Sequence, residues 1–280
     1  MALPDNFNLP EFVQRVLAED LGRGDVTSEA TIAEDARFTA EMNARQALVV
    51  AGIEVAAGFF RALDENVHVE QLIADGARVE RGTTLMRLAG NARSMLAAER
   101  SALNTIQHLS GIATMTRQYA DAIDGTGTVL LDTRKTIPGL RVLEKFASRM
   151  GGAQNHRMRL DDGVLIKDNH VAVCGSVAEA VRRAKAAGTG LQVQVEVDRI
   201  DQIEPALAAG ADRLLLDNMD PAQLRQAVQL VSRRVPLEAS GGVTLETIRF
   251  LAETGVTFIS VGRLTQSAPA VDIGLDYSLG

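Results

Sequence analysis

The sequence predicts a two-domain α/β protein in which an α+β domain precedes a repeated strand–helix unit. Two observations support this fold class. Up to about residue 115, short strand patterns are mixed with helical ones. From Thr128 onward, short apolar runs alternate with helical stretches, and such a repeat builds a parallel sheet or a barrel. The length of 280 residues also favours two domains, or one barrel with an extension.

The first half of the chain begins with helical patterns and short strands. Residues 11–21 place their apolar side chains on one helical face, and Pro10 suits the first turn of that helix. A second helix is expected at Ile53–Leu63. Strand patterns occur at 38–42, 47–50 and 67–70. These elements make up the predicted first domain, residues 1–115.

A long helix follows. Apolar residues recur every three or four positions from Ser94 to Ile123, and Gly111 is expected to kink or interrupt the helix. Two polar residues of this stretch are notable. His108 is interpreted as a hydrogen-bonded packing residue, whereas the pattern alone leaves the role of Arg100 open.

The second half of the chain repeats one unit. Six strands are expected at Val129–Leu131, Val164–Ile166, Val193–Val197, Arg213–Leu216, Pro236–Glu238 and Phe258–Val261. Helices are expected between them at 140–150, 176–187, 199–209, 220–233 and 244–254. The last four strands start about 20 to 23 residues apart, which is the spacing of a βα repeat.

Polar residues collect directly after these strands. In a βα barrel the carboxyl ends of the strands share one face, and that face carries the active site. Some of these residues are explained as helix N-caps, namely Asp198, Asn218 and Thr244. Capping does not explain the residues that end strands rather than start helices, which are Lys135, Lys167, Glu196 and Asp217. We therefore predict a catalytic face at this end of the repeat.

The stretch from Asp132 to His170 carries a local excess of positive charge. It contains eight Lys/Arg against five Asp/Glu in a chain of net charge −7. Such an excess in an acidic protein suggests an anion-binding site. Other cations of the stretch, Arg141, Lys145 and Arg149, fall on the polar side of a predicted helix, and we expect no chemical role for them.

Two further features predict phosphate and metal binding. Ser240, Gly241 and Gly242 precede a helix and offer bare backbone N–H groups, and Gly262 follows the last strand. The loops after the last two strands are the usual phosphate site of a barrel. Glu196 and Asp217 lie one repeat apart, so they could share a hard divalent cation such as Mg²⁺ or hold sugar hydroxyls. The sum is an enzyme for a phosphorylated, polyanionic substrate.

The composition excludes several classes of protein. Apolar residues make up 46% and charged residues 23%, which is ordinary for a soluble globular protein. We expect no secretory signal, and no apolar run approaches the ~18 residues of a membrane span. The single Cys174 excludes an internal disulfide and a multi-cysteine zinc site. A cytoplasmic protein without membrane contact is expected.

Nucleic acid is not expected as a partner. The net charge is −7 and the isoelectric point is about 5.2, whereas nucleic-acid-binding proteins carry basic surfaces. The chain has no tryptophan, eight phenylalanines and two tyrosines, which leaves few platforms for base stacking.

Ordered motifs then give a family resemblance. Those at the strand ends are Asp-Thr-Arg-Lys-Thr (132–136), Asn-His-Arg (155–157), Leu-Ile-Lys-Asp-Asn-His (165–170), Leu-Asp-Asn-Met (216–219) and Glu-Ala-Ser-Gly-Gly (238–242). The earlier ones are Glu-Asp-Leu-Gly-Arg-Gly-Asp-Val-Thr (19–27) and Glu-Arg-Ser-Ala-Leu-Asn (99–104). Together they closely resemble the quinolinate phosphoribosyltransferase family over nearly the whole chain.

The resemblance implies an architecture and a reaction. The architecture is an N-terminal α+β sandwich domain packed on an incomplete (β/α) barrel at 116–269, with the tail 270–280 packing on the first domain. The reaction joins quinolinate to phosphoribosyl pyrophosphate with Mg²⁺ and yields nicotinate mononucleotide, pyrophosphate and CO₂ in NAD biosynthesis. It also implies a homodimer in which the first domain of one subunit completes the site of the other.

The resemblance also implies residue roles. The residues expected to bind the quinolinate carboxylates are Arg134, His156 and Arg157, with Arg100 reaching in from the partner subunit. Lys135 and Lys167 are expected to contact the reacting groups, and Glu196 and Asp217 the ribose hydroxyls and Mg²⁺–pyrophosphate. The 5′-phosphate is assigned to Ser240, Gly241 and Gly262.

The chain departs from the family pattern at two positions. Gln266 stands where the family usually has a histidine, so any acid–base use of that histidine would be absent here. Ala153 stands in a stretch where Gly-Gly-Gly is common, a mild change because alanine disfavours positive φ.

Three hypotheses follow for the function. The first is the quinolinate reaction, which the trio Arg134, His156 and Arg157 favours because a dicarboxylate needs several cationic partners. The second is a related phosphoribosyltransferase that acts on nicotinate or another heteroaromatic acid. The third is a non-catalytic phosphoribosyl sensor, which would bind ligand without forming product.

Overall fold

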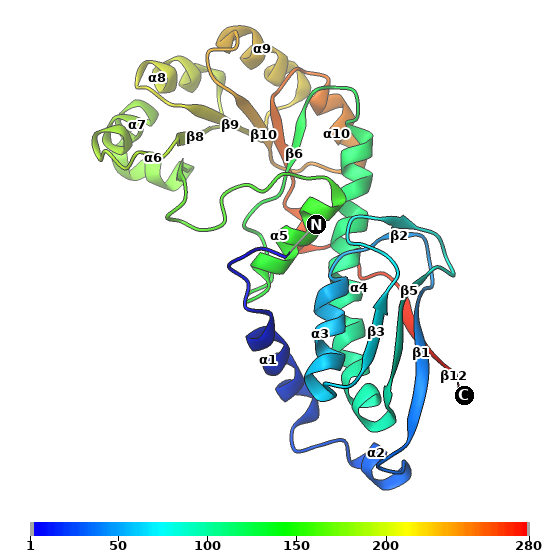
Figure 1. Ribbon diagram of the computed structural model, residues 1–280. Helices are drawn as coiled ribbons and strands as arrows, with labels where there is room; N and C mark the ends of the chain where they lie inside the picture. Colours follow the sequence, from blue (N-terminus) through cyan, green and yellow to red (C-terminus); the bar gives the residue numbers. More distant parts are fainter. Residues whose placement is uncertain (1–2, 279–280) are drawn as a thin grey trace. The chain divides into compact units, whose positions relative to one another are not determined.

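A computed structural model of the chain describes residues 3–278, which form two compact units (Figure 1). The first unit contains the chain up to Arg117, the segment Val142–Gly151 and the chain from Ser267 onward. The second contains Gln118–Arg141 and Gly152–Gln266. The predicted division at 115/116 and 269/270 therefore differs by a few residues at each junction, and it misplaces one helix.

The first unit is built on an antiparallel sheet with the strand order β12-β1-β5-β3. Its strands are β1 (Arg37–Ala44), β3 (His68–Gln71), β5 (Thr84–Asn91) and β12 (Ile273–Ser278). A separate two-stranded ribbon pairs β2 (Leu48–Val49) with β4 (Arg78–Val79). The helices are α1 (Leu9–Leu21), α2 (Val26–Thr31), α3 (Ile53–Leu63), α4 (Ala92–Ala122) and α5 (Arg141–Gly151).

The long helix α4 contradicts one part of an expectation, the interruption at Gly111. It runs without interruption through Gly111, where the sequence predicted a kink or break. Glycine is required there by a close approach, because a Cβ would lie 2.2 Å from the carbonyl oxygen of Pro269. Pro269 belongs to the segment that leads into β12. The tail from Ile273 then pairs antiparallel with β1, and Asp276 accepts a hydrogen bond of 2.7 Å from Asn43.

Helix α5 contradicts a second expectation. The sequence placed it in the barrel, with a polar side carrying Lys145, but Glu144 and Lys145 are both buried within the first unit. A Cβ at Gly151 would lie 2.5 Å from the carbonyl oxygen of Ala113, so α5 ends directly against α4. Nε2 of His108 lies 2.8 Å from Oε1 of Glu144, which confirms the packing role predicted for this histidine.

The second unit contains a sheet of six parallel strands in the order β6-β11-β10-β9-β8-β7. The strands are β6 (Val129–Leu131), β7 (Val164–Ile166), β8 (Val193–Val197), β9 (Arg213–Asp217), β10 (Leu237–Ser240) and β11 (Phe258–Ser260). All lie within two residues of their predicted bounds. The strands β6 and β7, which come first in this unit, form the two ends of the sheet. The predicted incomplete (β/α) barrel is confirmed.

Helices accompany these strands, as Figure 1 shows for α7 to α10. They are α6 (Asp168–Cys174), α7 (Val177–Ala186), η1 (Ile200–Gln202), α8 (Ile203–Ala208), α9 (Pro221–Val231), α10 (Leu245–Ala252) and α11 (Arg263–Gln266). The sequence did not predict α6 or α11. Within residues 3–278, no helix combines the length and apolar character that a bilayer crossing requires.

Side chains alternate along the barrel strands between the core and the barrel interior. In β9, Leu214 and Leu216 are fully buried, whereas Leu215 and Asp217 line the large pocket of this unit. The same alternation directs Glu196 of β8 and Ser240 of β10 to the pocket. The apolar residues between them anchor the strands and so fix where the polar side chains lie.

Candidate active site

A pocket of about 830 Å³ opens at the carboxyl ends of the barrel strands. Every predicted site residue of the second unit lines it, namely Arg134, Lys135, His156, Arg157, Lys167, Glu196, Asp217, Ser240, Gly241 and Gly262. Arg100 does not, because it is exposed on α4 in the first unit. Its predicted action from a partner subunit stays a prediction, whereas the others are brought together by one chain.

Two guanidinium groups dominate one side of this pocket. Nε of Arg134 is buried and donates no hydrogen bond to any described residue. Nη1 of Arg157 donates to the carbonyl oxygen of Gly163 at 2.9 Å. Burial, followed by the nearby charge of Arg134, lowers the pKa of Arg157 below its ordinary value. Two like charges held close together in a half-buried site favour an anionic ligand.

The segment that carries Arg157 is held by a buried carboxylate at the end of β6. Oδ1 of Asp132 accepts from the backbone N–H of His156 at 2.8 Å, and Oδ2 accepts from the side-chain amide of Asn155 at 2.5 Å. Asp132 is fully buried, so these charge-assisted hydrogen bonds are shielded from water. Within the segment, the N–H of Arg157 donates to Nδ1 of His156 at 2.8 Å.

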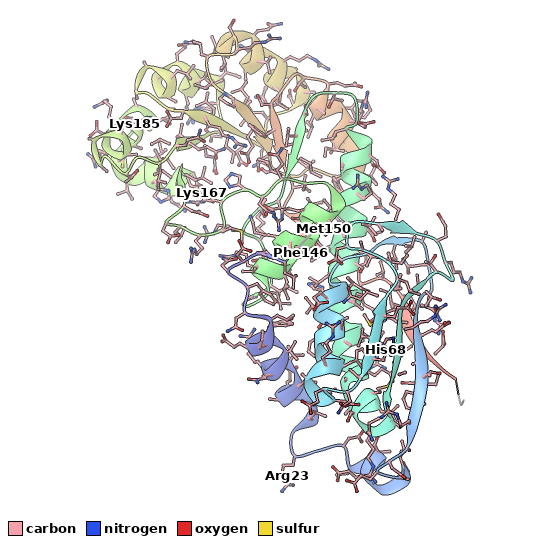
Figure 2. The ribbon with its side chains drawn as sticks, viewed as in Figure 1. Arg23, His68, Phe146, Met150, Lys167 and Lys185 are labelled. Carbon is pink, nitrogen blue, oxygen red and sulfur yellow. The ribbon has the colours of Figure 1, made fainter. Side chains whose placement is uncertain are left out.

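A second group of pocket side chains, which we call the acidic side, consists of acids and a lysine. Lys167 is the N-cap residue of α6 and is labelled in Figure 2. Its Nζ lies 3.3 Å from Oε2 of Glu196. Burial raises the pKa of Glu196, Lys167 opposes this, and the charge of Asp217 raises it further. Burial likewise raises the pKa of Asp217, although Lys167 and a hydrogen bond from Asn218 pull it down. Two desolvated carboxylates near each other favour a cation.

This acidic pair fits Mg²⁺ only with help from a ligand. No group of three or more His, Cys, Asp or Glu side chains suited to a metal occurs within residues 3–278. Glu196 and Asp217 can offer hard carboxylate oxygens, and Mg²⁺ commonly binds through one or two carboxylates plus phosphate oxygens and water. The residues therefore fit a magnesium ion that arrives with a phosphorylated substrate.

The loop after β10 has the shape of a phosphate cradle. Gly241 has φ +96°, and a Cβ there would lie 2.1 Å from Oδ1 of Asn218 and 2.9 Å from its backbone nitrogen. Only glycine allows this backbone to sit so close to the loop after β9. The N–H of Asn218 donates to the carbonyl oxygen of Ser240 at 2.8 Å, which ties the two loops together.

Asn218 corrects one sequence interpretation. It was explained as a helix cap, but the N-cap of α9 is Asp220, whose Oδ1 accepts from the N–H groups of Ala222 and Gln223. Asn218 instead adopts a left-handed conformation with φ +55° and lines the pocket. Asp198 caps no helix either, since the N-cap of η1 is Arg199, whereas the predicted cap Thr244 does precede α10.

Gly262 positions a lysine on the far side of the same pocket. A Cβ at Gly262 would lie 2.8 Å from Cδ of Lys135, so the glycine makes room for the lysine stem. The hydroxyl of Thr265 donates to the carbonyl oxygen of Lys135 at 2.7 Å and fixes its backbone. Contacts between residues about 130 positions apart thereby define the site of the Lys135 ammonium group.

Several pocket residues were not assigned by the sequence. Thr133, Asn218, Glu238, Arg263 and Gln266 all line the pocket. The alternation of β10 was a usable signal for Glu238, because Glu238 and Ser240 must point to the same side of the strand. The predicted strand ended at Glu238, so it did not include Ser240 and the alternation between the two residues was not recognised.

Comparison with known proteins identifies the family of the chain. Residues 25–110 match the family model of the quinolinate phosphoribosyl transferase N-terminal domain, and residues 112–276 match that of the C-terminal domain. The chain belongs to the quinolinate phosphoribosyltransferase family. The resemblance inferred from the motifs is therefore confirmed, and the residues that line the pocket lie within the match to the C-terminal domain.

Named relatives of this family cover almost the whole chain. A probable nicotinate-nucleotide pyrophosphorylase [carboxylating] of Bacillus subtilis is 42% identical and covers 98% of this chain and 95% of that protein. A Mycobacterium leprae protein of the same name is 44% identical and covers 94% and 95%. The solved nicotinate-nucleotide pyrophosphorylase of Francisella tularensis superposes with a TM-score of 0.94 at 39% identity over 99% and 100%.

Proposed function

We propose that this pocket transfers the phosphoribosyl group of phosphoribosyl pyrophosphate to quinolinate with decarboxylation. The products are nicotinate mononucleotide, pyrophosphate and CO₂, so the enzyme is a pentosyltransferase of NAD biosynthesis. Membership of the family supports the reaction. The observation that carries the proposal for this chain is the pair Arg134 and Arg157. Their guanidinium groups lie close together in a half-buried pocket that also holds two desolvated acids, Glu196 and Asp217.

The quinolinate carboxylates would bind at the guanidinium side. A planar guanidinium can meet a carboxylate through two parallel N–H···O bonds, which gives both affinity and orientation. Arg134 and Arg157 would each take one carboxylate, with His156 beside them. This grip would aim the pyridine nitrogen at the sugar.

The phosphoribosyl group would occupy the opposite side. Backbone N–H groups at Ser240, Gly241 and Gly262 would bind the 5′-phosphate without side-chain interference. Lys135 and Lys167 would contact substrate and phosphate oxygens as point charges. Glu196 and Asp217 would hold the ribose hydroxyls and the magnesium, which when bound neutralises charge that develops on the leaving pyrophosphate.

The first chemical step needs little acid–base help from the protein. The pyridine nitrogen is already a nucleophile, and it attacks the anomeric carbon as the bond to pyrophosphate breaks. The chain would act by aligning the two substrates and stabilising charge on an oxocarbenium-like sugar. The positions of the two arginines and of the phosphate loop set this alignment.

Decarboxylation would follow on the pyridinium ring. The bond between C2 and its carboxylate breaks, CO₂ leaves, and the electron pair at C2 is stabilised by the adjacent positive nitrogen until a proton is added. Lys135 is the candidate for that proton because it lines the pocket on a flexible stem. Gln266 lines the same pocket and cannot titrate near neutral pH, so it has no acid–base part.

A homodimer with a shared site is part of the proposal, and so is a cytoplasmic location. Arg100 is exposed on α4 and lines no part of the pocket of its own chain, so it is free to reach a partner's site. In a mixed dimer of Arg100→Ala and Asp217→Asn chains, one of the two sites would hold both native residues. We expect activity to return on mixing two inactive variants, and a mixture as inactive as its parents would contradict the shared site.

The direct experiment supplies quinolinate, phosphoribosyl pyrophosphate and Mg²⁺. We expect nicotinate mononucleotide and CO₂ in equal amounts, measured by chromatography and by trapped gas. Turnover of nicotinate without turnover of quinolinate would contradict the proposal and favour the related transferase. Ligand binding without product in a single-turnover experiment would instead indicate a sensor.

A further inference from the structure

A buried polar cluster lies inside the barrel beneath the proposed quinolinate site. It consists of Gln194 on β8, Arg213 on β9, Glu238 on β10 and Ser260 on β11, which meet His156. Barrel interiors are usually filled with branched apolar side chains, so a charged layer at this depth requires an explanation. Glu238 stands at its centre with 1% of its surface exposed.

The contacts of Glu238 neutralise and fix its carboxylate. Oε2 accepts from the side-chain amide of Gln194 at 2.8 Å and lies 2.5 Å from Nη2 of Arg213. The guanidinium carbon of Arg213 lies 3.8 Å from the ring centroid of Phe258, so a cation–π contact holds this arginine from the other side. Burial raises the pKa of Glu238, but the neighbouring imidazole of His156 and the charge of Arg213 outweigh it and hold the pKa below its ordinary value.

The same carboxylate faces His156. Nε2 of His156 lies 3.5 Å from Oε2 of Glu238, and the imidazole is 13% exposed. Nδ1 accepts from the N–H of Arg157, so Nδ1 carries no proton and the ring hydrogen is on Nε2. The N–H end of the imidazole therefore lies over Glu238.

We propose that Glu238 is a positioning residue for the quinolinate site. It holds His156 in one tautomer against the pocket floor, and His156 in turn receives the backbone N–H of Arg157. Arg213 offsets the charge of Glu238, so this buried carboxylate adds little repulsion toward an anionic ligand. The inference rests on the proposed function, because quinolinate is the ligand that His156 and Arg157 would bind.

The kinetic test uses Glu238→Gln, which keeps the size of the side chain and removes its charge. We expect the KM for quinolinate to rise about tenfold while the KM for phosphoribosyl pyrophosphate stays within about twofold. Parallel rises in both KM values would overturn the proposal, because a merely structural residue affects both substrates. The matched control is Glu253→Gln, an exposed glutamate paired with Arg249 in the same unit, which should change neither KM.

A double variant separates positioning from stability. Replacing a buried ion pair by apolar residues of similar volume often preserves stability. Arg213→Met with Glu238→Leu should therefore fold, yet still show the raised KM for quinolinate. A quinolinate KM restored to the wild-type value in the double variant would overturn the proposal. The raised KM of Glu238→Gln would then have come only from the charge of Arg213, which that variant leaves unpaired.

The spectroscopic test needs no substrate. The chain has four histidines, so ¹⁵N-histidine spectra are simple, and His156→Asn identifies the His156 signals by their loss. We expect the Nε2–H tautomer in wild type and a tautomer mixture in Glu238→Gln, or in Glu238→Asp if the glutamine variant does not fold. An Nδ1–H tautomer in wild type, or a spectrum unchanged by both variants, would overturn the proposal. If the wild-type protein does not turn over quinolinate, the proposed function is refuted. The histidine spectra still decide whether Glu238 fixes the tautomer of His156.

Discussion

The two sides of the pocket differ in the charge that burial disfavours: positive charge on the guanidinium side and negative charge on the acidic side. On the guanidinium side, burial and the charge of Arg134 lower the pKa of Arg157. On the acidic side, burial raises the pKa of both Glu196 and Asp217, and their mutual repulsion adds to the rise in Glu196. Each side is thus less stable in its charged form than it would be in water, and each is relieved by a ligand of opposite charge.

The difference teaches which substrate belongs on which side. The guanidinium side relies on Asp132 and Glu238 for support, and both acids are already engaged by the protein. The acidic side has Lys167 at 3.3 Å from Glu196, a partially exposed contact that a metal-bound pyrophosphate could rearrange. A dicarboxylate therefore suits the first side and a magnesium-bound phosphoribosyl group the second. A substitution on one side should therefore leave ligand binding on the other side almost unchanged.

The largest expected effect is on the acidic side. Asp217→Asn should lower kcat about 10²- to 10³-fold, because preorganised electrostatic groups in active sites contribute that much. Binding of quinolinate should change little, because Asp217 lies on the other side. Steady-state kinetics measure both, with the exposed Asp201→Asn as control. A large loss of quinolinate affinity would mean that the two sides are not separate.

The next effect is on the guanidinium side. Arg157→Ala should raise the KM for quinolinate about 10- to 100-fold, since hydrogen bonds to charged groups contribute roughly 1.5–3 kcal/mol. The KM for phosphoribosyl pyrophosphate should change less than about threefold. Arg159→Ala is the matched control, because Arg159 is exposed and its Nε lies 3.4 Å from Oδ1 of the equally exposed Asp161. Equal losses for both substrates would contradict the assignment.

A smaller effect is expected at the phosphate loop. Gly241→Ala places a Cβ 2.1 Å from Oδ1 of Asn218 at φ +96°, which should lower the free energy of unfolding by about 1–3 kcal/mol. The KM for phosphoribosyl pyrophosphate should rise as the loop shifts. Gly188→Ala has φ +62° and open space, so it should cost about 1 kcal/mol and leave kinetics unchanged. Urea unfolding compares the two, and equal costs would argue against the close approach.

The smallest expected effect is a gain in stability. The raised pKa of Glu196 means that the folded protein binds its proton more tightly than the unfolded chain does. Stability is therefore lost as pH rises from the ordinary glutamate pKa through the raised one. Glu196→Gln should increase the free energy of unfolding by about 0.5–1 kcal/mol at pH 7, a gain that shrinks toward pH 4. A Glu196→Gln variant that is less stable than the wild type at pH 7 would contradict the raised pKa of Glu196.

Sequence reasoning predicted the barrel strands because each is a short apolar run with a polar residue at its end. The pocket residues at those ends, such as Lys167 and Asp217, were found for the same reason. The role of Glu238 was not, because it depends on Gln194, Arg213 and His156, which are remote in the chain. Pairwise contacts of this kind leave no periodic signal.

Two helices show the same limit. The apolar pattern of α5 was clear, but its two buried charges, Glu144 and Lys145, resemble an exposed polar side when only the sequence is considered. In the sequence, Gly111 of α4 resembled a helix breaker. Its glycine is instead required by the close approach of the carbonyl oxygen of Pro269. In both cases the neighbour that decides the matter lies in a distant part of the chain.

The central claim is that the half-buried pair Arg134 and Arg157 selects a dicarboxylate. Titration calorimetry with quinolinate and with nicotinate tests it directly, first on the protein alone and then with pyrophosphate and Mg²⁺ present so that binding order cannot hide an affinity. We predict that quinolinate binds about 10- to 100-fold more tightly than nicotinate, because the second carboxylate gains a charge-assisted pair. Equal affinity for the two acids under both conditions would contradict the account.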